Sequence, residues 1–187
     1  MRSQLRPAIV MILLMTVLTG MIYPAVVTGI AQGLFPHRAN GSLIVENGHV
    51  VGSELIGQNF ARPEYFHPRP SAAGYDATAS GGSNLGPASR LLVARVDSLS
   101  KALHGENPGA PVPVDLVTTS ASGLDPDITP AAAEFQAPRV AAARKLSLER
   151  VRELIVANTE SRQLGILGEP RVNVLLLNRA LDAATSR

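Results

Sequence analysis

The order of hydrophobic and polar positions divides the chain into an apolar N-terminal run and a longer mixed segment. No charged side chain occurs between Arg6 and His37, and the stretch Ala8–Val27 is almost wholly apolar. About 20 apolar residues in a helix cross the ~30 Å hydrocarbon core of a bilayer. The pattern therefore predicts a transmembrane anchor over residues 1–36 and a soluble domain over residues 37–187.

A transmembrane anchor has two alternatives, a buried core helix and a cleavable signal peptide. The core of a chain this short seldom hides so long an apolar run. Cleavage after Ala31 would fit the small residues around it and would release a secreted binding domain, but the apolar region of a signal peptide is usually only ~7–15 residues long. Gly29 and Gly33 form the GxxxG spacing that lets membrane helices approach closely. Pro24 removes a backbone donor and predicts a kink.

The charges that flank the apolar run predict its orientation. Arg2 and Arg6 precede it, and Arg38, Glu46 and Glu54 follow it. By the positive-inside rule, the N-terminus is cytoplasmic and the rest of the chain extracytoplasmic.

The first part of the predicted domain reads as a hairpin and a long loop. Apolar residues flank Glu46-Asn47-Gly48-His49, and Asn-Gly is a strong hairpin-turn sequence because both positions need a positive φ. From Gln58 to Pro87 the periodicity disappears, yet this stretch holds four of the chain's seven aromatic residues. Aromatic residues argue against disorder, so we expect an ordered, functional loop.

Beyond the loop, a helical stripe is predicted, with Gly105 just past its end. Its members share one face: Leu85, Ala88, Leu92, Val96, Leu99 and Leu103. A short strand is predicted over Val112–Thr118.

Three further helices are predicted from their caps. Thr129 before Pro130 begins one that runs toward Ala137 and is broken or restarted at Pro138. Ser147 caps a helix through Val156, and Asn173 caps another with Val174, Leu177 and Leu181 inward. The predicted fold class is α+β: one N-terminal transmembrane helix followed by a small extracytoplasmic domain with long ordered loops.

Composition and charge remove several classes of function. The chain has no cysteine, which excludes disulfides, zinc–thiolate sites, iron–sulfur clusters and thiol nucleophiles. From residue 40 onward, 14 Lys and Arg face 15 Asp and Glu. A nucleic-acid partner is not expected, because such proteins carry a basic face or stripe.

Catalytic motifs are missing from the sequence. It contains no Gly-x-Ser-x-Gly elbow, no His-Glu-x-x-His pattern and no phosphate-binding Gly-x-x-x-x-Gly-Lys loop. Ser71, His67 and Asp76 would form the triad of a membrane-anchored periplasmic hydrolase only if the fold brought them together. Asp125 and Asp127 suit either a cation or a turn, and Leu-Asp-Pro-Asp favours the turn. No metal site is therefore predicted.

Two more clusters have a bland and a functional interpretation. A basic cluster with a single acid, Glu149, consists of Arg139, Arg144, Lys145, Arg150 and Arg152. Such a cluster is usually a solvated helix face, and we favour this interpretation over a binding site for phosphate or lipid headgroups. The run 80–84 (Ser-Gly-Gly-Ser-Asn) fits an anion-binding nest, but a tight loop is favoured.

Six segments, taken in order, resemble one family. They are GSELIGQ (52–58), YFHPRPS (65–71), SGGSNLGP (80–87), PVDLVT (113–118), SASGLDP (120–126) and GEPRVNVL (168–175). Together with the anchor, they make the chain similar to the C subunit of the Kdp potassium-transporting ATPase, the KdpC family. Asp127 departs from the family's Leu-Asp-Pro-His pattern, and Pro138 interrupts a stretch that the family keeps helical.

The resemblance implies a non-catalytic accessory subunit of a potassium-import complex in the bacterial inner membrane. The implied partners are a channel-like potassium-binding subunit, a P-type ATP-hydrolysing subunit and a small membrane peptide. No cofactor is expected on the subunit itself, and ATP enters only through the pump subunit. The sequence agrees, since it has no Asp-Lys-Thr-Gly phosphorylation motif and one apolar helix cannot form a pore.

The resemblance also attaches a role in ATP affinity to a Gln that matches Gln136. The predicted topology places Gln136 outside the membrane, whereas ATP is cytoplasmic, so an indirect effect through pump conformation is expected.

The loop Gln58–Pro87 is our hypothesis for the docking surface, because clustered aromatic residues are typical of interface anchors. The alternative is that these rings pin the loop to its own domain. The candidate interface residues are Tyr65, Phe66, His67, Arg69, Ser80, Gly81, Gly82, Ser83 and Asn84.

Overall fold

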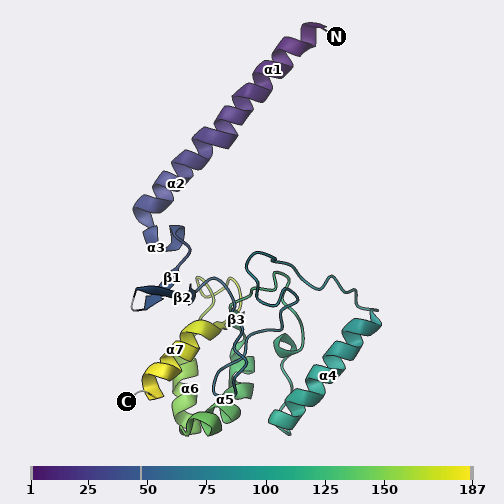
Figure 1. Ribbon diagram of the computed structural model, residues 1–187, viewed down its shortest axis with the longest axis vertical. Helices are drawn as coiled ribbons and strands as arrows, with labels where there is room; N and C mark the ends of the chain where they lie inside the picture. Colours follow the sequence, from purple (N-terminus) through teal and green to yellow (C-terminus); the bar gives the residue numbers. More distant parts are fainter. Residues whose placement is uncertain (1, 47, 186–187) are drawn as a thin grey trace. The chain divides into compact units, whose positions relative to one another are not determined.

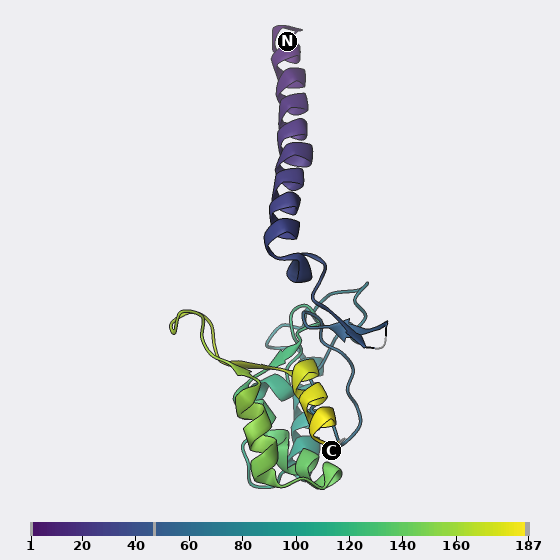
Figure 2. The same cartoon turned by 90° about the vertical axis from the view of Figure 1, so that its left-hand side faces the viewer.

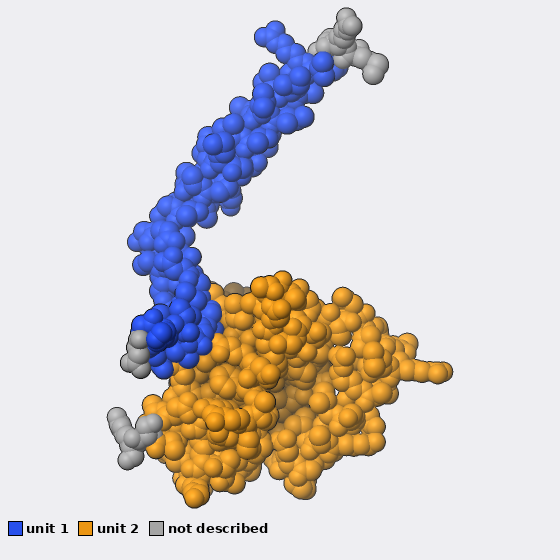
Figure 3. Space-filling model, viewed as in Figure 1, with its two compact units in different colours: residues 1–53 blue, residues 54–187 orange. Residues whose placement is uncertain are grey.

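The structure of the chain, a computed structural model, describes residues 2–46 and 48–185 (Figure 1). It is α+β, and it divides into two compact units, residues 1–53 and residues 54–187 (Figure 3). The predicted hairpin falls in the same compact unit as the N-terminal helix. The predicted boundary after residue 36, which separates an anchor from a soluble domain, stays a prediction.

Unit 1 begins with one long helix built from α1 (Arg2–Val17), a π-helical turn η1 (Leu18–Ile22) and α2 (Tyr23–Leu34). The segment Gln4–Leu34 has 31 residues and a mean hydropathy of 2.2 in its most apolar window, with none of that window buried. At 1.5 Å per residue it is about 46 Å long, enough for a bilayer core. By length and composition it is a candidate membrane span, the one found among the described residues.

The π-helical turn explains how the helix passes through Pro24. Proline has no N–H to offer the carbonyl of Gly20, and its ring crowds that carbonyl. The chain widens just before it, and the N–H of Tyr23 bonds to the carbonyl of Leu18, five residues back. The Thr19 hydroxyl donates to the Met15 carbonyl at 2.6 Å. The predicted disturbance is thus absorbed in a local change of hydrogen-bond pattern, and the helix continues.

The predicted hairpin is confirmed. A short helix, α3 (Pro36–Ala39), leads to strands β1 (Leu43–Glu46) and β2 (His49–Ser53), which pair antiparallel with Glu46 opposite His49. Gly48, one of the two predicted turn residues, has a φ of +78°. Asn47, the other predicted turn residue, lies outside the described residues.

Unit 2 contains four helices longer than one turn, a 3-10 turn and a small sheet. In chain order the elements are α4 (Arg90–Glu106), η2 (Val114–Leu116), β3 (Asp127–Ile128), α5 (Pro130–Arg144), α6 (Leu148–Ala157), β4 (Thr159–Glu160), β5 (Arg171–Asn173) and α7 (Val174–Thr185). The antiparallel sheet has the order β3-β5-β4, with Val172 at its centre fully buried. Residues 54–89 contain no helix or strand, as predicted for the loop.

The predicted caps are confirmed. The hydroxyls of Thr129 and Ser147 accept hydrogen bonds from Ala132 N and Arg150 N, both at 3.1 Å. The side chain of Asn173 accepts from Leu176 N at 3.1 Å. These side chains satisfy backbone donors that a helix leaves free in its first turn.

Three predictions of local structure are wrong. The segment Val112–Thr118 contains the 3-10 turn η2 and no strand. Pro111 and Pro113 have no N–H with which to pair to a neighbouring strand. The carbonyl of Pro113 instead accepts a hydrogen bond from Leu116 N, which closes the turn. Gly105 lies inside α4. Helix α5 runs unbroken through Pro138, whose ring faces solvent while the buried side of the helix holds it in place.

The core of unit 2 forms where α5, α6 and α7 pack together below the sheet (Figure 1). Four alanines on α5 (132, 133, 137 and 141) belong to this core, and their small side chains allow close packing. The larger buried side chains in the same core include Phe66, Phe135, Val140, Val151, Ile155, Leu177 and Leu181. Helix α4 has no buried residue; its Leu103 is partly buried and packs against this core, and its Glu106 pairs with Arg139 of α5. Phe66 is the one member contributed by the long loop, so the loop is fixed from inside the core.

Candidate functional site

Two buried amide side chains hold the centre of the long loop. Asn178 on α7 accepts a hydrogen bond from Phe66 N at 2.8 Å and donates one to Phe66 O at 3.0 Å. Gln136 on α5 does the same for the next residue, accepting from His67 N at 2.8 Å and donating to His67 O at 3.1 Å. We call Gln136 and Asn178 the amide clamp. Their side chains supply the hydrogen bonds that a neighbouring strand would otherwise provide to the backbone of Phe66 and His67.

Every hydrogen-bonding position of the Gln136 amide is used. Its oxygen also accepts from Arg139 at 2.8 Å, and its nitrogen also donates to Ala132 O at 3.3 Å. The residue is 2% exposed. An amide has two donor hydrogens and two acceptor lone pairs, so none remains for a ligand.

Two arginines fasten the residues just before the clamp. Arg139 donates to Pro63 O at 2.6 Å and Tyr65 O at 3.0 Å, and Arg144 donates to Glu64 O at 2.6 Å. Burial lowers the pKa of Arg139 more than its ion pair with Glu106 raises it. Arg139 and Arg144 therefore hold the loop by hydrogen bonds inside the domain. The prediction of a solvated face holds for Lys145, Arg150 and Arg152, which are exposed.

Tyr65 is held from two sides. The Arg62 and Arg144 guanidinium carbons lie 5.0 and 4.8 Å from the centre of its ring, and its hydroxyl lies 3.3 Å from Asp182. Arg144 itself pairs with Asp182 at 2.7 Å. Two cation–π contacts to one ring favour a fixed position. Together with the burial of Phe66, this arrangement matches the alternative in which the aromatic residues pin the loop to its own domain.

His67 and Arg69 leave the clamp in different directions. The ring of His67 lines a cavity of about 350 Å³ between the loop and α4, and its Nε2 lies 3.1 Å from Arg62 O. Burial is the largest effect lowering the pKa of His67, and Arg139 lowers it further, against smaller opposing contributions from Arg62 O and Glu106. Arg69 forms an ion pair with Asp125 at 3.0 Å.

The run 80–84 packs against the segment that follows η2. Gly81 N donates to Ser122 O at 2.8 Å, and the Ser80 hydroxyl donates to the same oxygen at 3.0 Å. A Cβ on Gly82 would lie 2.9 Å from Ala121 O, so only glycine fits there. Ser83 is partly buried and Asn84 is exposed. These contacts support the tight-loop interpretation.

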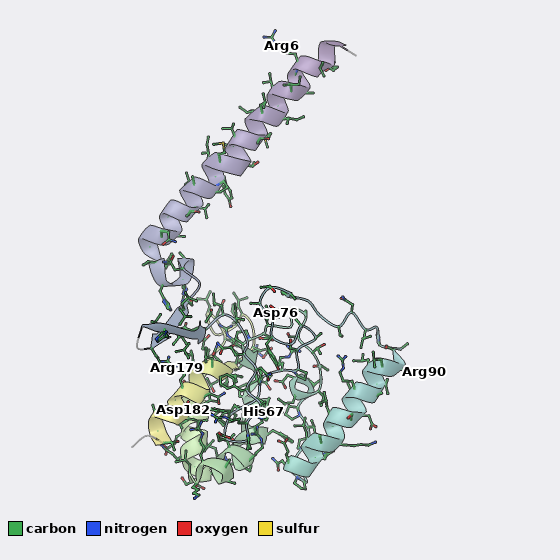
Figure 4. The ribbon with its side chains drawn as sticks, in the orientation of Figure 1. Arg6, His67, Asp76, Arg90, Arg179 and Asp182 are labelled. Carbon is green, nitrogen blue, oxygen red and sulfur yellow. The ribbon has the colours of Figure 1, made fainter. Side chains whose placement is uncertain are left out.

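The residues of the hypothetical triad do not form one. The Ser71 hydroxyl donates to Gly123 O at 2.6 Å and accepts from the backbone N–H groups of Ala73 and Tyr75. Asp76 is exposed and bonds to Thr78, which lowers the pKa of Asp76. Figure 4 shows Asp76 apart from His67. The three side chains serve separate local turns.

The two aspartates of Leu-Asp-Pro-Asp form the predicted turn, with Asp125 accepting from Asp127 N at 3.1 Å. Each also has its own arginine: Asp125 pairs with Arg69 and Asp127 with Arg171. Burial raises the pKa of Asp127, against the effect of Arg171. Among residues 2–46 and 48–185, no group of three or more metal-ligating side chains is placed to hold an ion.

Sequence reasoning missed Asn178 and an exposed hairpin over residues 161–169. Asn178 falls on the inward face of α7, where an amide among leucines was the available indication of a buried hydrogen-bonding role. In the hairpin, Leu164, Ile166 and Leu167 alternate with glycines in a segment that has no helical or strand period. Such apolar residues in a loop indicate an exposed contact surface.

Comparison with known proteins gives one consistent result. Residues 5–183 match the family model described as KdpC, the c chain of K+-transporting ATPase. The chain is 61% identical to the potassium-transporting ATPase KdpC subunit of Caulobacter vibrioides (strain NA1000 / CB15N), over 98% of this chain and 94% of that protein. It is 54% identical to the subunit of the same name from Bradyrhizobium diazoefficiens, over the full length of both, and 54% identical to that of Koribacter versatilis, over 97% of this chain and 95% of that protein.

The match covers both units, the apolar helix as well as the clamped loop and the sheet. The chain therefore belongs to the KdpC family.

Proposed function

We propose that this chain is the non-catalytic accessory subunit of an ATP-driven potassium-import complex in a bacterial inner membrane. The observation that carries the proposal is the family match over residues 5–183, which includes a helix of membrane-spanning length. The subunit joins and stabilises a channel-like potassium-binding subunit, a P-type ATP-hydrolysing subunit and a small membrane peptide. It binds no cofactor of its own.

The orientation proposed from the flanking arginines keeps the N-terminus in the cytoplasm and unit 2 in the periplasm. Any influence on the ATP affinity of the pump is then indirect, by preferential binding to one pump conformation. The saturated hydrogen bonding of Gln136 supports this version. Gln136 contributes by fixing the loop, and ATP remains a ligand of the pump subunit.

The docking surface within the long loop is narrower than the sequence suggests. Phe66 is in the core, and His67 and Arg69 are partly buried, whereas Ser80 and Asn84 are exposed. We propose that the run 80–84 and the exposed edges of Tyr65, His67 and Arg69 form this surface. The amide clamp holds the backbone of Phe66 and His67, and Ser122 O accepts hydrogen bonds from Ser80 and Gly81, so this surface is preorganised for binding.

Assembly is tested by producing the whole complex with an affinity tag on this chain. The expected result is that the pump and channel-like subunits co-purify with it and hydrolyse ATP in response to potassium, while the chain alone hydrolyses none. A complex that forms and works equally well without the chain would contradict the proposal.

Orientation is tested with single cysteines in the otherwise cysteine-free chain. A cysteine at Ala142, exposed on α5, is expected to react with a membrane-impermeant maleimide in intact spheroplasts. Ala137 on the same helix is fully buried and provides the matched control that reacts only after unfolding. Protection of residue 142 until the membrane is permeabilised would reverse the proposed topology.

A further inference from the structure

The hairpin of residues 161–169, between β4 and β5, presents an exposed aliphatic tip. All nine residues are exposed, including three aliphatic ones: Leu164 at 88%, Ile166 at 74% and Leu167 at 54%. Figure 2 shows this segment extending away from the rest of unit 2. Aliphatic side chains gathered on a projection mark a contact site more often than isolated exposed ones.

The tip has a defined internal structure. Gln163 and Leu167 exchange two backbone hydrogen bonds of 2.9 Å, and Gly165 N donates to Arg162 O at 3.1 Å. An ion pair between Arg162 and Glu169 closes the stem. Leu164 adopts a φ of +54°, a conformation that L residues seldom adopt. A leucine at a position where glycine fits better costs some backbone strain and places an exposed aliphatic side chain at the tip.

The fold itself does not use the tip. None of its residues belongs to the core cluster of unit 2. At its base, a hollow of about 500 Å³ is lined partly by Ile155, Val156 and Ser161, and Val156 is 74% exposed. Ser161, at the base of the hairpin, lines this hollow, whereas residues 164–167 at the tip do not.

Charge and size identify the kind of partner. Membrane-surface anchors combine apolar residues with free Lys or Arg. Residues 164–167 carry only aliphatic side chains, and Arg162 in the stem of the hairpin is paired with Glu169. A second copy of the chain would need a contact of roughly 800 Å² on each side for a stable dimer, more than three side chains provide. A projection of this size fits a concave apolar pocket in a protein that is already held nearby.

We propose that residues 164–167 dock into an apolar pocket of another protein subunit of the potassium-transporting complex. The inference rests on the proposed function, which supplies that partner. A second, independent attachment through the membrane helix raises the effective concentration of the tip, so a small contact suffices.

The test uses the full chain, produced with the other subunits and purified through a tag on this chain. Replacing Leu164, Ile166 and Leu167 with Ser is expected to reduce co-purification of the partners by about 10-fold or more. The matched control replaces three exposed aliphatic residues elsewhere in unit 2, Leu91, Val93 and Val114. It is expected to assemble like the unmodified chain. Equal co-purification of tip variant and control would overturn the proposal.

A single substitution separates docking from the shape of the turn. Leu164→Gly removes the side chain and relieves the positive φ, so the domain is expected to melt at the same temperature or higher. Assembly is nevertheless expected to weaken several-fold. If Leu164→Gly assembles as well as the unmodified chain, the side chain is not used for docking and the proposal fails.

A photo-crosslinking residue at position 166 in intact membranes identifies the occupant. The expected product is a single adduct with the channel-like or the ATP-hydrolysing subunit. Adducts with lipid alone, or with a second copy of the chain, would overturn the proposal while leaving the accessory function intact. If the unmodified chain co-purifies with no partner, the proposed function fails first and the docking proposal fails with it.

Discussion

At the scale of single residues, each side chain of the amide clamp acts both as a hydrogen-bond acceptor and as a donor for the loop backbone. Gln136 and Asn178 are buried polar groups, which are costly unless they are fully paired. Here each amide bonds both to the N–H and to the C=O of one loop residue, so the loop backbone and the side chains satisfy each other. The price of removing one amide is therefore two unpaired backbone groups in the core.

Gln136→Ala is expected to lower the free energy of unfolding of unit 2 by about 2–4 kcal/mol. The loss combines the missing hydrogen bonds with unpaired groups at His67 and Arg139. Urea unfolding of the full chain in detergent, followed by circular dichroism, measures the change. The control is Gln163→Ala on the exposed hairpin, where a change below about 0.5 kcal/mol is expected. A similar effect of both variants would contradict the clamp.

His67 gives unit 2 a specific dependence on pH. Its pKa in the folded state is lowered, chiefly by burial, below the usual value of 6.5. The unfolded chain therefore binds the proton first as pH falls, so stability is complete above about pH 6.5 and declines below it. We expect the free energy of unfolding to fall more steeply between pH 7.5 and 5.5 in the unmodified chain than in His67→Gln. The control His104→Gln, on the exposed face of α4, should keep the steeper fall.

At the scale of elements, α5 illustrates how tertiary packing overrides a local rule. A proline inside a helix removes one hydrogen bond and ordinarily breaks the helix. Pro138 and the residue one turn earlier, Glu134, both lie on the exposed side, so the orphan carbonyl faces water. The opposite side of α5 is buried almost without interruption, and that packing keeps the helix whole.

Pro138→Ala is expected to raise the stability of unit 2 by about 1–2 kcal/mol, because it restores a helical hydrogen bond on the exposed face. The matched control is Pro130→Ala at the first position of the same helix, where proline replaces no hydrogen bond and the change should be small. Thermal unfolding of the two variants measures the difference. If Pro138→Ala destabilises the domain, Pro138 itself contributes to the packing of α5 and this interpretation fails.

The elements differ in how far the sequence determines them. Thr129, Ser147 and Asn173 cap helices through contacts within three residues, so local patterns predicted them. The β-branched residues of Val112–Thr118 favour a strand, but Pro111 and Pro113 have no N–H to pair, so this segment contains a 3-10 turn instead. Strands β3, β4 and β5 have only two or three residues each, and they exist because distant segments meet. The roles of Gln136 and Asn178 depend on contacts 69 and 112 residues away, which no local pattern contains.

At the scale of the whole molecule, the two units have separate sources of stability. Every member of the core cluster lies between residues 66 and 181, inside unit 2. A fragment of residues 54–187 is therefore expected to fold without detergent and to unfold at the same urea concentration as unit 2 in the full chain. A lower midpoint, or a fragment that does not fold, would show that unit 1 contributes to the stability of unit 2.

The amide clamp also sets an order of events during protein synthesis. Asn178 follows Phe66 by 112 residues, so the ribosome has made nearly all of the domain before the loop backbone finds its last partner. Until then, Phe66 and the alanine-lined face of α5 have no complete core to occupy, and a prematurely terminated chain ending before α7 stays open to proteases. Copies that include α7 therefore have both halves of the clamp, whereas copies that end before it lack the Asn178 half.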